Sequence, residues 1–182
     1  MTNDLELNRH QDREVKSFSI HPRYSGRRRL YKDIAVIHLK TPFELSLNVH
    51  PISLPESEDT YDVDDCVVLG WGNQGAKIMK QVHLSLVENG KCQNLIRATP
   101  EKSDRFRLDD SFVCAGGEKG KDVCEGDGGG PLVCKRKANN RYVLIIPDET
   151  LKITSERRLQ FCSIENHQSL RLCSRLALFI MS

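Results

Sequence analysis

The fold of this chain is decided by one stretch, Gly120-Lys121-Asp122-Val123-Cys124-Glu125-Gly126-Asp127-Gly128-Gly129-Gly130-Pro131-Leu132-Val133-Cys134. Two cysteines bracket a glycine-rich turn that holds one acid, Asp127, and an apolar run follows the turn. Three consecutive glycines on their own would suit a flexible linker. The flanking cysteines and the Pro-Leu-Val run instead predict a fixed turn that leads into a strand.

Outward from this stretch, the chain contains several short apolar segments with strand character and little helix. The run Asp33–Leu39 is continuously apolar after its first residue, as in a buried strand. The run Ile78–Val87 alternates, which places its apolar residues on one face of a strand and His83 on the solvent side. The other expected elements are strands over residues 15–20, 66–72 and 141–146, an acidic loop over residues 61–65, and a short helix over residues 91–97.

The composition describes an ordinary globular protein of one domain. The chain has 182 residues, of which 38% are hydrophobic and 29% are charged, with a formal net charge of +2. This nearly neutral charge predicts no nucleic-acid partner, and we interpret the basic run Arg27–Arg29 as a solvated loop tip. No apolar run approaches the ~18 residues of a membrane span, so we expect no membrane segment.

The chain has seven cysteines, Cys66, Cys92, Cys114, Cys124, Cys134, Cys162 and Cys173. No two of them have the C-x-x-C spacing of a zinc site or a redox motif. We therefore expect disulfides, which form in an oxidising compartment. The first residues, 1–6, show neither the basic nor the apolar region of a signal peptide, so we expect the sequence to lack an N-terminal part.

Several motifs in order resemble those of the trypsin-like (chymotrypsin-fold, S1) serine proteases. Residues 126–131 read Gly-Asp-Gly-Gly-Gly-Pro, where the family has Gly-Asp-Ser-Gly-Gly-Pro. The run that begins at Asp33 resembles the family's Asp-Ile-Ala-Leu-Leu strand, and residues 70–72 match its Gly-Trp-Gly strand. Residues 10–15 and 107–112 narrow the resemblance to the clip-domain serine protease homologues of arthropods.

The resemblance covers residues 9–144 and implies an all-β fold. This fold is a partial chymotrypsin-like double antiparallel β-barrel, with the end of the first barrel and most of the second. Residues 56–144 should form most of one barrel and residues 9–50 part of another, which leaves an open edge and an exposed apolar face. We therefore divide the chain into a partial protease-homologue domain, residues 1–144, and a divergent tail of unknown structure, residues 145–182.

The resemblance places Gly128 at the position of the nucleophilic serine, and glycine has no side chain that a base can activate. It makes Asp33 the counterpart of the catalytic aspartate, although a turn residue at the start of a strand would look the same. The family's Thr-Ala-Ala-His-Cys segment has no counterpart, and His10, His21 and His38 lie in other contexts. We therefore expect no intact catalytic triad.

Other parts of the family's site persist as remnants. Gly126 and Gly128 match the positions whose backbone N–H groups form the oxyanion hole. Asp122 matches the acid that selects Arg or Lys substrates, with a surface turn acid as the alternative. Asp127 matches the acid that pairs with a freshly cut N-terminus, which we do not expect here, so we expect the Asp127 carboxylate to be unpaired.

The resemblance also implies two disulfides, Cys66–Cys134 and Cys92–Cys114. The family's partner for Cys124 lies in the region where the resemblance ends. Cys124 is therefore expected to be either free or bonded to Cys162 or Cys173.

By this resemblance we expect a catalytically inactive serine protease homologue. It would be a secreted binding or cofactor protein in an arthropod innate-immune cascade of the prophenoloxidase type, with proteases or zymogens as partners and no cofactor or metal. The alternatives are a trypsin-type serine endopeptidase and a truncated, non-functional gene product. The residue at position 128 separates an enzyme from an inactive homologue, and glycine there favours the inactive homologue.

Overall fold

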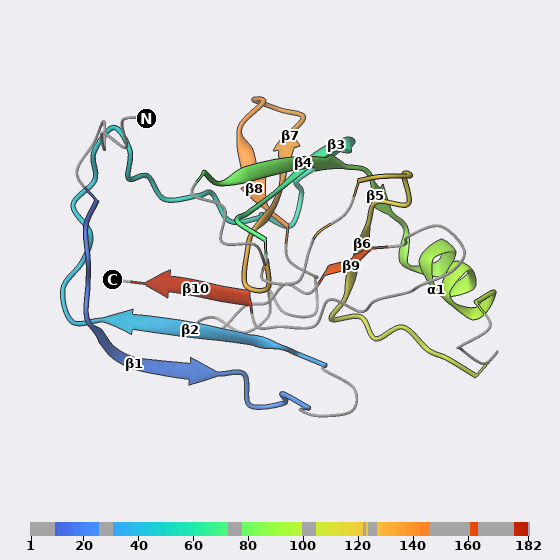
Figure 1. The fold of residues 1–182 in the computed structure, drawn as a ribbon, viewed down its shortest axis with the longest axis horizontal. Coiled ribbons are helices and arrows are strands. Elements are labelled where there is room, and N and C mark those ends of the chain that lie inside the picture. The colour runs from blue at the N-terminus through green and yellow to red at the C-terminus, as the bar shows by residue number, and fades with distance from the viewer. Residues whose placement is uncertain are drawn as a thin grey trace, which may run out of the picture.

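The computed structural model describes residues 10–25, 31–72, 78–99, 105–121, 123, 127–145, 161–163 and 177–181. These residues form short strands and one short helix (Figure 1). The strands are β1 (Val15–Ile20), β2 (Ile34–Leu39), β3 (Tyr61–Gly70), β4 (Lys80–Leu84), β5 (Leu86–Val87), β6 (Val113–Ala115), β7 (Leu132–Arg136), β8 (Tyr142–Leu144), β9 (Phe161–Ser163) and β10 (Ala177–Met181). The helix is α1 (Asn89–Arg97). The predicted all-β class is confirmed.

The strands form three sheets, whose orders are β1-β2-β10, β4-β3-β7-β8 and β5-β6-β9. Neighbouring strands from β1 to β8 pair antiparallel, as the resemblance implies. Both strands from the tail pair in parallel instead: β9 pairs with β6, and β10 pairs with β2. Figure 1 shows β10 next to β2 and β9 next to β6. The described parts of the tail therefore extend two of the sheets.

The alternating run over residues 78–87 forms two strands, because the chain changes partner at Ser85. Before this residue β4 pairs with β3, and after it β5 pairs with β6. The Ser85 backbone carbonyl accepts a hydrogen bond from Gly116 N at 2.8 Å, which joins the two sheets at the break. A strand that switches sheets in this way turns the corner between two layers. His83 is exposed on the solvent face, as the alternation predicts.

The prediction of an acidic loop over residues 61–65 is wrong, because these residues form the first half of β3. The pairing of β3 with β7 is irregular between Tyr61 and Cys66, which admits a charged segment into a strand. Arg136 on β7 holds Asp59, just before β3, with Nε–Oδ1 and Nη2–Oδ2 distances of 2.6 and 2.8 Å. Within the segment, Asp65 bonds to Lys135 on β7 and to His83 on β4. Charge-assisted bonds of this kind make an acid compatible with a sheet.

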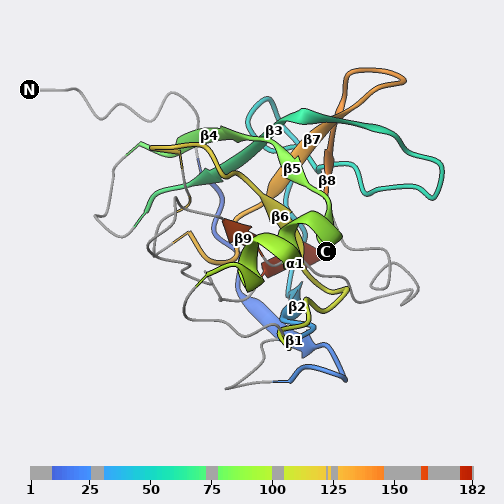
Figure 2. The same cartoon turned by 90° about the vertical axis from the view of Figure 1, so that its right-hand side faces the viewer.

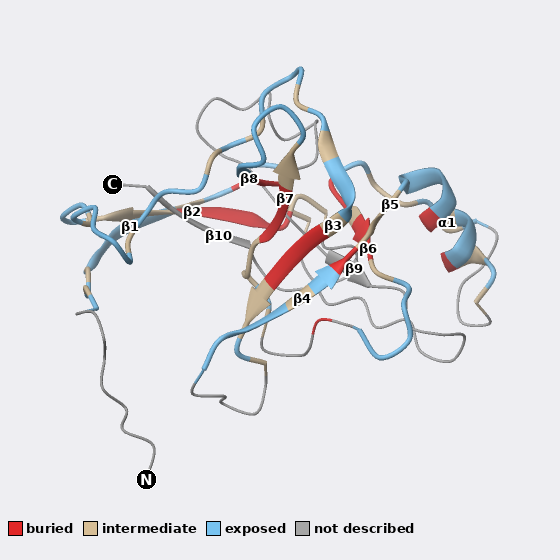
Figure 3. Ribbon diagram, turned by 90° about the horizontal axis from the view of Figure 1, so that it is seen from above, coloured by how far each residue is buried: buried red, intermediate tan, exposed pale blue. Residues whose placement is uncertain are grey.

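The main core is formed by buried residues of the β4-β3-β7-β8 sheet and of the elements that pack against it. Its buried members include Val67, Val68, Leu84, Leu132, Val133 and Leu144, together with Ile34 from β2. A smaller cluster joins α1 to β6 through Cys92, Ile96 and Cys114 (Figure 2). Figure 3 shows that burial is concentrated on β3 and β7 and at the start of β2, whereas β1 is exposed along most of its length. In the part of the chain that the structure describes, no helix is long and apolar enough to span a membrane.

Candidate functional site

The glycine-rich stretch forms a tight turn immediately before β7. Gly130 N donates a hydrogen bond to the Asp127 carbonyl at 2.9 Å, which closes a four-residue turn. Gly129, the third residue of the turn, has φ 89°, a backbone conformation that favours glycine at this position. Gly128, the second residue, is exposed. The turn therefore presents Gly128 to solvent.

The Asp127 side chain fixes this turn to the end of β3. Its Oδ1 accepts a hydrogen bond from Gly72 N at 2.6 Å. The contact is possible because Gly70 has no side chain: a Cβ there would lie 2.1 Å from Asp127 Oδ1. A Cβ on Gly130 would lie 2.7 Å from the Leu69 carbonyl oxygen, so the turn needs glycine on both sides of the contact. The expectation that Asp127 lacks a partner is wrong, since a backbone amide takes that place.

Asp33 is buried, with 3% of its surface exposed, at the residue before β2. The backbone around it is held firmly: Lys32 has φ 55°, its N–H donates to Ser111 Oγ at 3.1 Å, and Ile34 N donates to the Lys32 carbonyl at 3.0 Å. Ile34, the next residue, packs in the same core cluster as Leu132. The start of β2 and the strand that follows the Gly128 turn therefore share one core.

The described histidines next to these elements are engaged in other contacts. His21 is buried; its Nδ1 accepts a hydrogen bond from Arg23 N at 2.9 Å, and its backbone N–H donates to the Ile34 carbonyl at 3.1 Å. His38 Nε2 lies 3.3 Å from Ser19 Oγ on β1, and His10 Nε2 lies 3.2 Å from Asp12 Oδ2. His21 is thus the histidine that the backbone places next to the Asp33 segment.

Two residues of the expected site, Asp122 and Gly126, lie outside the described residues, as do Cys124 and Cys173. The structure holds the two disulfides that the resemblance implies, Cys66–Cys134 and Cys92–Cys114. They close loops with sequence separations of 68 and 22 residues. On the chain-entropy model these loops contribute about 4 and about 3 kcal/mol to stability.

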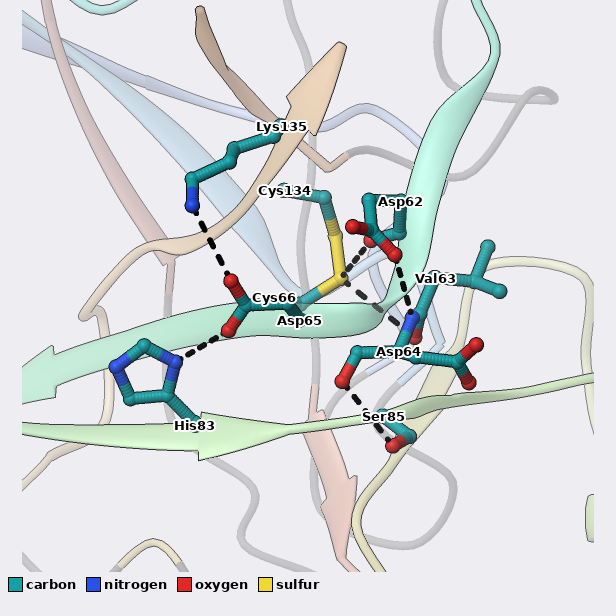
Figure 4. Close-up of a disulfide and its surroundings, with 9 residues drawn as sticks. All are labelled: Asp62, Val63, Asp64, Asp65, Cys66, His83, Ser85, Cys134 and Lys135. Atoms are coloured by element: carbon teal, nitrogen blue, oxygen red, sulfur yellow. Dashed lines mark hydrogen bonds and ion pairs between the residues drawn. A yellow bond between two sulfur atoms is a disulfide. The ribbon is translucent and has the colours of Figure 1, made fainter. Parts of the chain in front are cut away.

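A charged cluster that sequence reasoning missed lies beside the first disulfide (Figure 4). Asp65 bonds through one carboxylate oxygen to His83 Nδ1, and its other oxygen accepts from Lys135 Nζ at 3.2 Å. The His83 bond, and then the Lys135 bond and charge, lower the pKa of the Asp65 carboxyl below its usual 3.8. The alternation of β4 placed His83 correctly, but no signal in the sequence gives the pairing of strands that brings Asp65 to it. Among the described residues, no group of three or more His, Cys, Asp and Glu is arranged to hold a metal ion.

The sequence model of the family described as Trypsin matches residues 2–147. The chain belongs to the trypsin family. This match ends within three residues of Leu144, the last residue of β8.

Curated relatives of this chain include a phenoloxidase-activating factor and two inactive CLIP domain-containing serine proteases. It is 37% identical over 147 residues to phenoloxidase-activating factor 2 of Galleria mellonella, a match that covers 76% of the chain and 48% of that protein. It is 35% identical over 134 residues to inactive CLIP domain-containing serine protease A8 of Anopheles gambiae (71% of the chain, 36% of that protein). For inactive CLIP domain-containing serine protease A28 of Anopheles gambiae the values are 33% over 137 residues, 74% and 36%. The chain thus spans less than half the length of each relative.

Proposed function

We propose that this trypsin-family chain is a catalytically inactive protease homologue that acts by binding other proteins. One observation carries the proposal: an exposed glycine, Gly128, stands in the Gly-Asp-Gly-Gly-Gly-Pro turn, at the position that the resemblance assigns to the family's serine. Acyl transfer by this family needs a side-chain hydroxyl, a histidine that takes its proton, and an aspartate that orients the histidine. Glycine supplies no hydroxyl, and loss of the serine alone costs about 10⁶ in rate in a protease with the same triad chemistry.

The remaining parts of the site are proposed as remnants of the family's machinery. Asp33 keeps the place of the orienting aspartate, and its burial before β2 is what that role requires. Gly126 and Gly128 would contribute the oxyanion-hole amides, and Asp122 the specificity-pocket acid. The turn that carries Gly128 is held by Asp127 and Gly72, so the surface around it is fixed. A fixed surface without a nucleophile suits recognition of a partner rather than its cleavage.

We assign this binding role to an extracellular protease cascade of the prophenoloxidase type, as an innate-immune cofactor. The support comes from the relatives, one of which is named as a phenoloxidase-activating factor and two as inactive CLIP-domain proteases. Two disulfides in 182 residues suit an oxidising compartment. The proposed partners are proteases or zymogens of the cascade, with no cofactor. We also propose residues 1–144 as the protease-homologue domain and residues 145–182 as a divergent tail; the family match supports this division.

Fluorophosphonate labelling tests the loss of catalysis. The purified chain and its Gly128→Ser variant should both stay unlabelled, and neither should cleave Arg- or Lys-ester substrates. A new serine needs a histidine within hydrogen-bond reach, whereas His10, His21 and His38 are held by other contacts. An active trypsin-family protease serves as the labelling control. Labelling of Gly128→Ser well above background would mean that a histidine of this chain acts as base, and each of the three would then be replaced in turn.

The cofactor role is tested separately, with a purified cascade protease and prophenoloxidase. Adding the chain should change the rate at which phenoloxidase activity appears, and Gly128→Ser should act like the unmodified chain. A rate that is unchanged over a range of chain concentrations would contradict the cofactor role and leave the inactive site as a separate finding. Direct cleavage of the zymogen by the chain alone would instead support a trypsin-type endopeptidase.

A further inference from the structure

The start of α1 carries the only Asn-Gly pair of the sequence, Asn89-Gly90. Both residues are exposed, so water reaches them. Asparagine is a chemically labile residue. Its side-chain amide is attacked most easily when glycine follows, because a residue without Cβ leaves its backbone nitrogen unhindered and its backbone free to turn. Among the asparagines of this chain, Asn89 is therefore the one at which deamidation is chemically easiest.

The structure restrains both reacting groups of this pair. The nucleophile, Gly90 N, donates a hydrogen bond to Glu88 Oε1 at 2.7 Å, and Lys91 N donates to Glu88 Oε2 at 2.8 Å. The electrophile, the Asn89 side-chain amide, donates through Nδ2 to the Phe112 carbonyl at 3.2 Å. Attack of the nitrogen on the amide carbon therefore competes with two hydrogen bonds.

The Glu88 cap opposes the attack more directly than the other contacts. The nitrogen attacks after it loses its proton, and the carboxylate holds that proton in a charge-assisted hydrogen bond. The negative charge of the carboxylate also disfavours the negative charge that develops on Gly90 N as the proton leaves. A Cβ on Gly90 would lie 3.0 Å from both carboxylate oxygens, so the cap lies directly against the nucleophile.

We propose that Asn89 is a deamidation site and that the Glu88 cap keeps its reaction slow in the folded chain. Gly90 N loses its proton and bonds to Asn89 Cγ, the Cγ–Nδ2 bond breaks, and Nδ2 leaves as ammonia with that proton. Water then opens the cyclic imide at one of its two carbonyl carbons. Opening at Cγ gives an aspartate, and opening at the backbone carbonyl gives an isoaspartate. Water is the only co-reactant.

The modification releases the first turn of α1 from the segment before β6. Either product replaces the Asn89 Nδ2 donor with a carboxylate oxygen, which has no proton to share with the Phe112 carbonyl. Isoaspartate also adds one methylene to the backbone, which displaces the first turn from its cap. The Cys92–Cys114 disulfide and the buried Ile96 still hold the rest of the helix. The modified chain therefore keeps its fold, and its first turn of α1 opens more often.

The test compares deamidation rates at Asn89 in the full chain. Samples are held at physiological temperature and pH and mapped over time by mass spectrometry, with isoaspartate detected by protein isoaspartyl methyltransferase. Glu88→Ala should raise the rate about 2- to 30-fold, the change in population that loss of an N-cap side chain produces. Glu88→Asp, which keeps a capping carboxylate, should react as slowly as the unsubstituted chain. An unchanged rate in Glu88→Ala, or a product without isoaspartate, would overturn the proposal.

Two further variants separate the cap from other causes. Glu88→Ala/Gly90→Ala should return to the slow rate, because the added Cβ hinders the attacking nitrogen. Ile96→Val loosens the packing of α1 without touching the cap, so it should leave the rate unchanged. Equal acceleration in Ile96→Val and Glu88→Ala would mean that opening of the whole helix limits the reaction, and a fast double variant would mean that Gly90 N is not the nucleophile. Either result contradicts the proposal.

A second measurement uses the unsubstituted chain, so it does not depend on the folding of a variant. In urea at the same pH the cap is lost, and Asn89 should deamidate at least about 2-fold faster than in the folded chain. A peptide with the sequence of residues 86–95 gives the rate without any fold as a reference. Equal rates in the folded and the unfolded chain would show that the cap protects nothing.

Discussion

Residues 61–145 and residues 15–39 both contain short strands with apolar residues, yet the two regions bury these residues very differently. In the first region β3, β7 and β8 carry buried residues on a shared core (Figure 3). A disulfide also joins β3 to β7. In the second region β2 is buried at its start, but its neighbour β1 exposes 65% of Phe18 and 46% of Ile20. Phe18 and Ile20 are as apolar as the buried valines and leucines of β3 and β7, so the apolar character of a side chain does not by itself explain the difference.

The difference follows from what covers each sheet. Phe18 lies opposite Ile37, and Ile20 lies opposite Ala35, so the apolar residues of β1 share one face of the sheet with those of β2. Ala35 is buried, while Ile20 next to it is half exposed. A strand is buried only when a second layer lies over it. Among the described residues, the second layer covers the start of β2 but does not extend over β1. This arrangement matches the open edge and exposed apolar face that we expected for a partial barrel.

The comparison predicts that removing an apolar side chain lowers the free energy of unfolding much more in the first region than in the second. Leu132→Ala, at a fully buried position of β7, should lower the free energy of unfolding by about 2–5 kcal/mol because it leaves a cavity. Phe18→Ala, on the exposed face of β1, should change it by no more than about 0.5 kcal/mol. Urea unfolding of both variants beside the unmodified chain measures the two values.

Phe18 also serves as the control for this contrast. If a second molecule covers β1 in solution, Phe18→Ala should cost more as the protein concentration rises. Phe18→Ser should reduce binding of a hydrophobic dye while leaving the unfolding midpoint in place, because it removes apolar surface that is already exposed. A cost for Phe18→Ala as large as that for Leu132→Ala at every concentration would mean that β1 is buried, and the comparison would fail.

The Gly128 turn offers a second, intermediate effect within the better packed region. Gly70→Ala would place a Cβ 2.1 Å from Asp127 Oδ1 and 2.6 Å from its Cγ. Relief of this overlap should cost about 1–3 kcal/mol and break the bond to Gly72 N. In the double variant with Asp127→Ala the cost should be clearly smaller than the sum of the single costs, since the clashing atoms are gone. Unfolding free energies of the four proteins complete the cycle.

Gly130→Ala is the matched control for that cycle. Its Cβ would meet backbone atoms, the Leu69 and Asp127 carbonyl oxygens at 2.7 and 2.9 Å. Asp127→Ala keeps both of these atoms, so it should not rescue Gly130→Ala. Equal rescue of both glycine variants would mean that Asp127→Ala loosens the turn as a whole. The specific fit between Gly70 and the Asp127 carboxylate would then be the wrong explanation.

Sequence reasoning succeeded where a local pattern determines the structure. Strand β1 was predicted at its observed bounds, and β2 began one residue after the predicted Asp33. Helix α1 begins at Asn89, two residues before the predicted start, because the Glu88 side chain caps it. The cysteines and the Pro-Leu-Val run around the glycines indicated a fixed turn, and the hydrogen bond from Gly130 N to the Asp127 carbonyl agrees with that interpretation. In each case neighbouring residues alone carry the information.

The failures involve partners that are distant in sequence. The acids of residues 61–65 looked like a loop because His83 and Lys135, which bond to Asp65, lie on other strands. No sequence pattern indicated a partner for the Asp127 carboxylate, because the donor is the backbone N–H of Gly72. A backbone N–H is common to nearly all residues, so the sequence does not mark it. No sequence motif predicted the parallel pairing of β9 with β6 or of β10 with β2. Strand register and sheet order decide these contacts, and neither can be read from a local sequence pattern.

The smallest predicted effect concerns α1, whose first turn depends on a carboxylate. Glu88 accepts hydrogen bonds from Gly90 N and Lys91 N at 2.7 and 2.8 Å. These two amides lower the pKa of the Glu88 carboxyl below its usual 4.5. A carboxyl whose pKa is lower in the folded state contributes stability that is complete above the unfolded-state value. That contribution is lost as the pH falls below 4.5 through the folded-state value.

Glu88→Gln isolates this contribution, because glutamine keeps the shape and one acceptor oxygen but carries no charge. The unmodified chain should be slightly more stable than Glu88→Gln at neutral pH, and the difference should close as the pH falls below 4.5. Asp59 and Asp65, whose pKa values are also lowered, titrate equally in both proteins and cancel in the difference. Urea unfolding over a pH series measures it. A difference that stays constant down to strongly acidic pH would show that charge at the start of α1 contributes nothing, and that the cap acts through hydrogen-bond geometry alone.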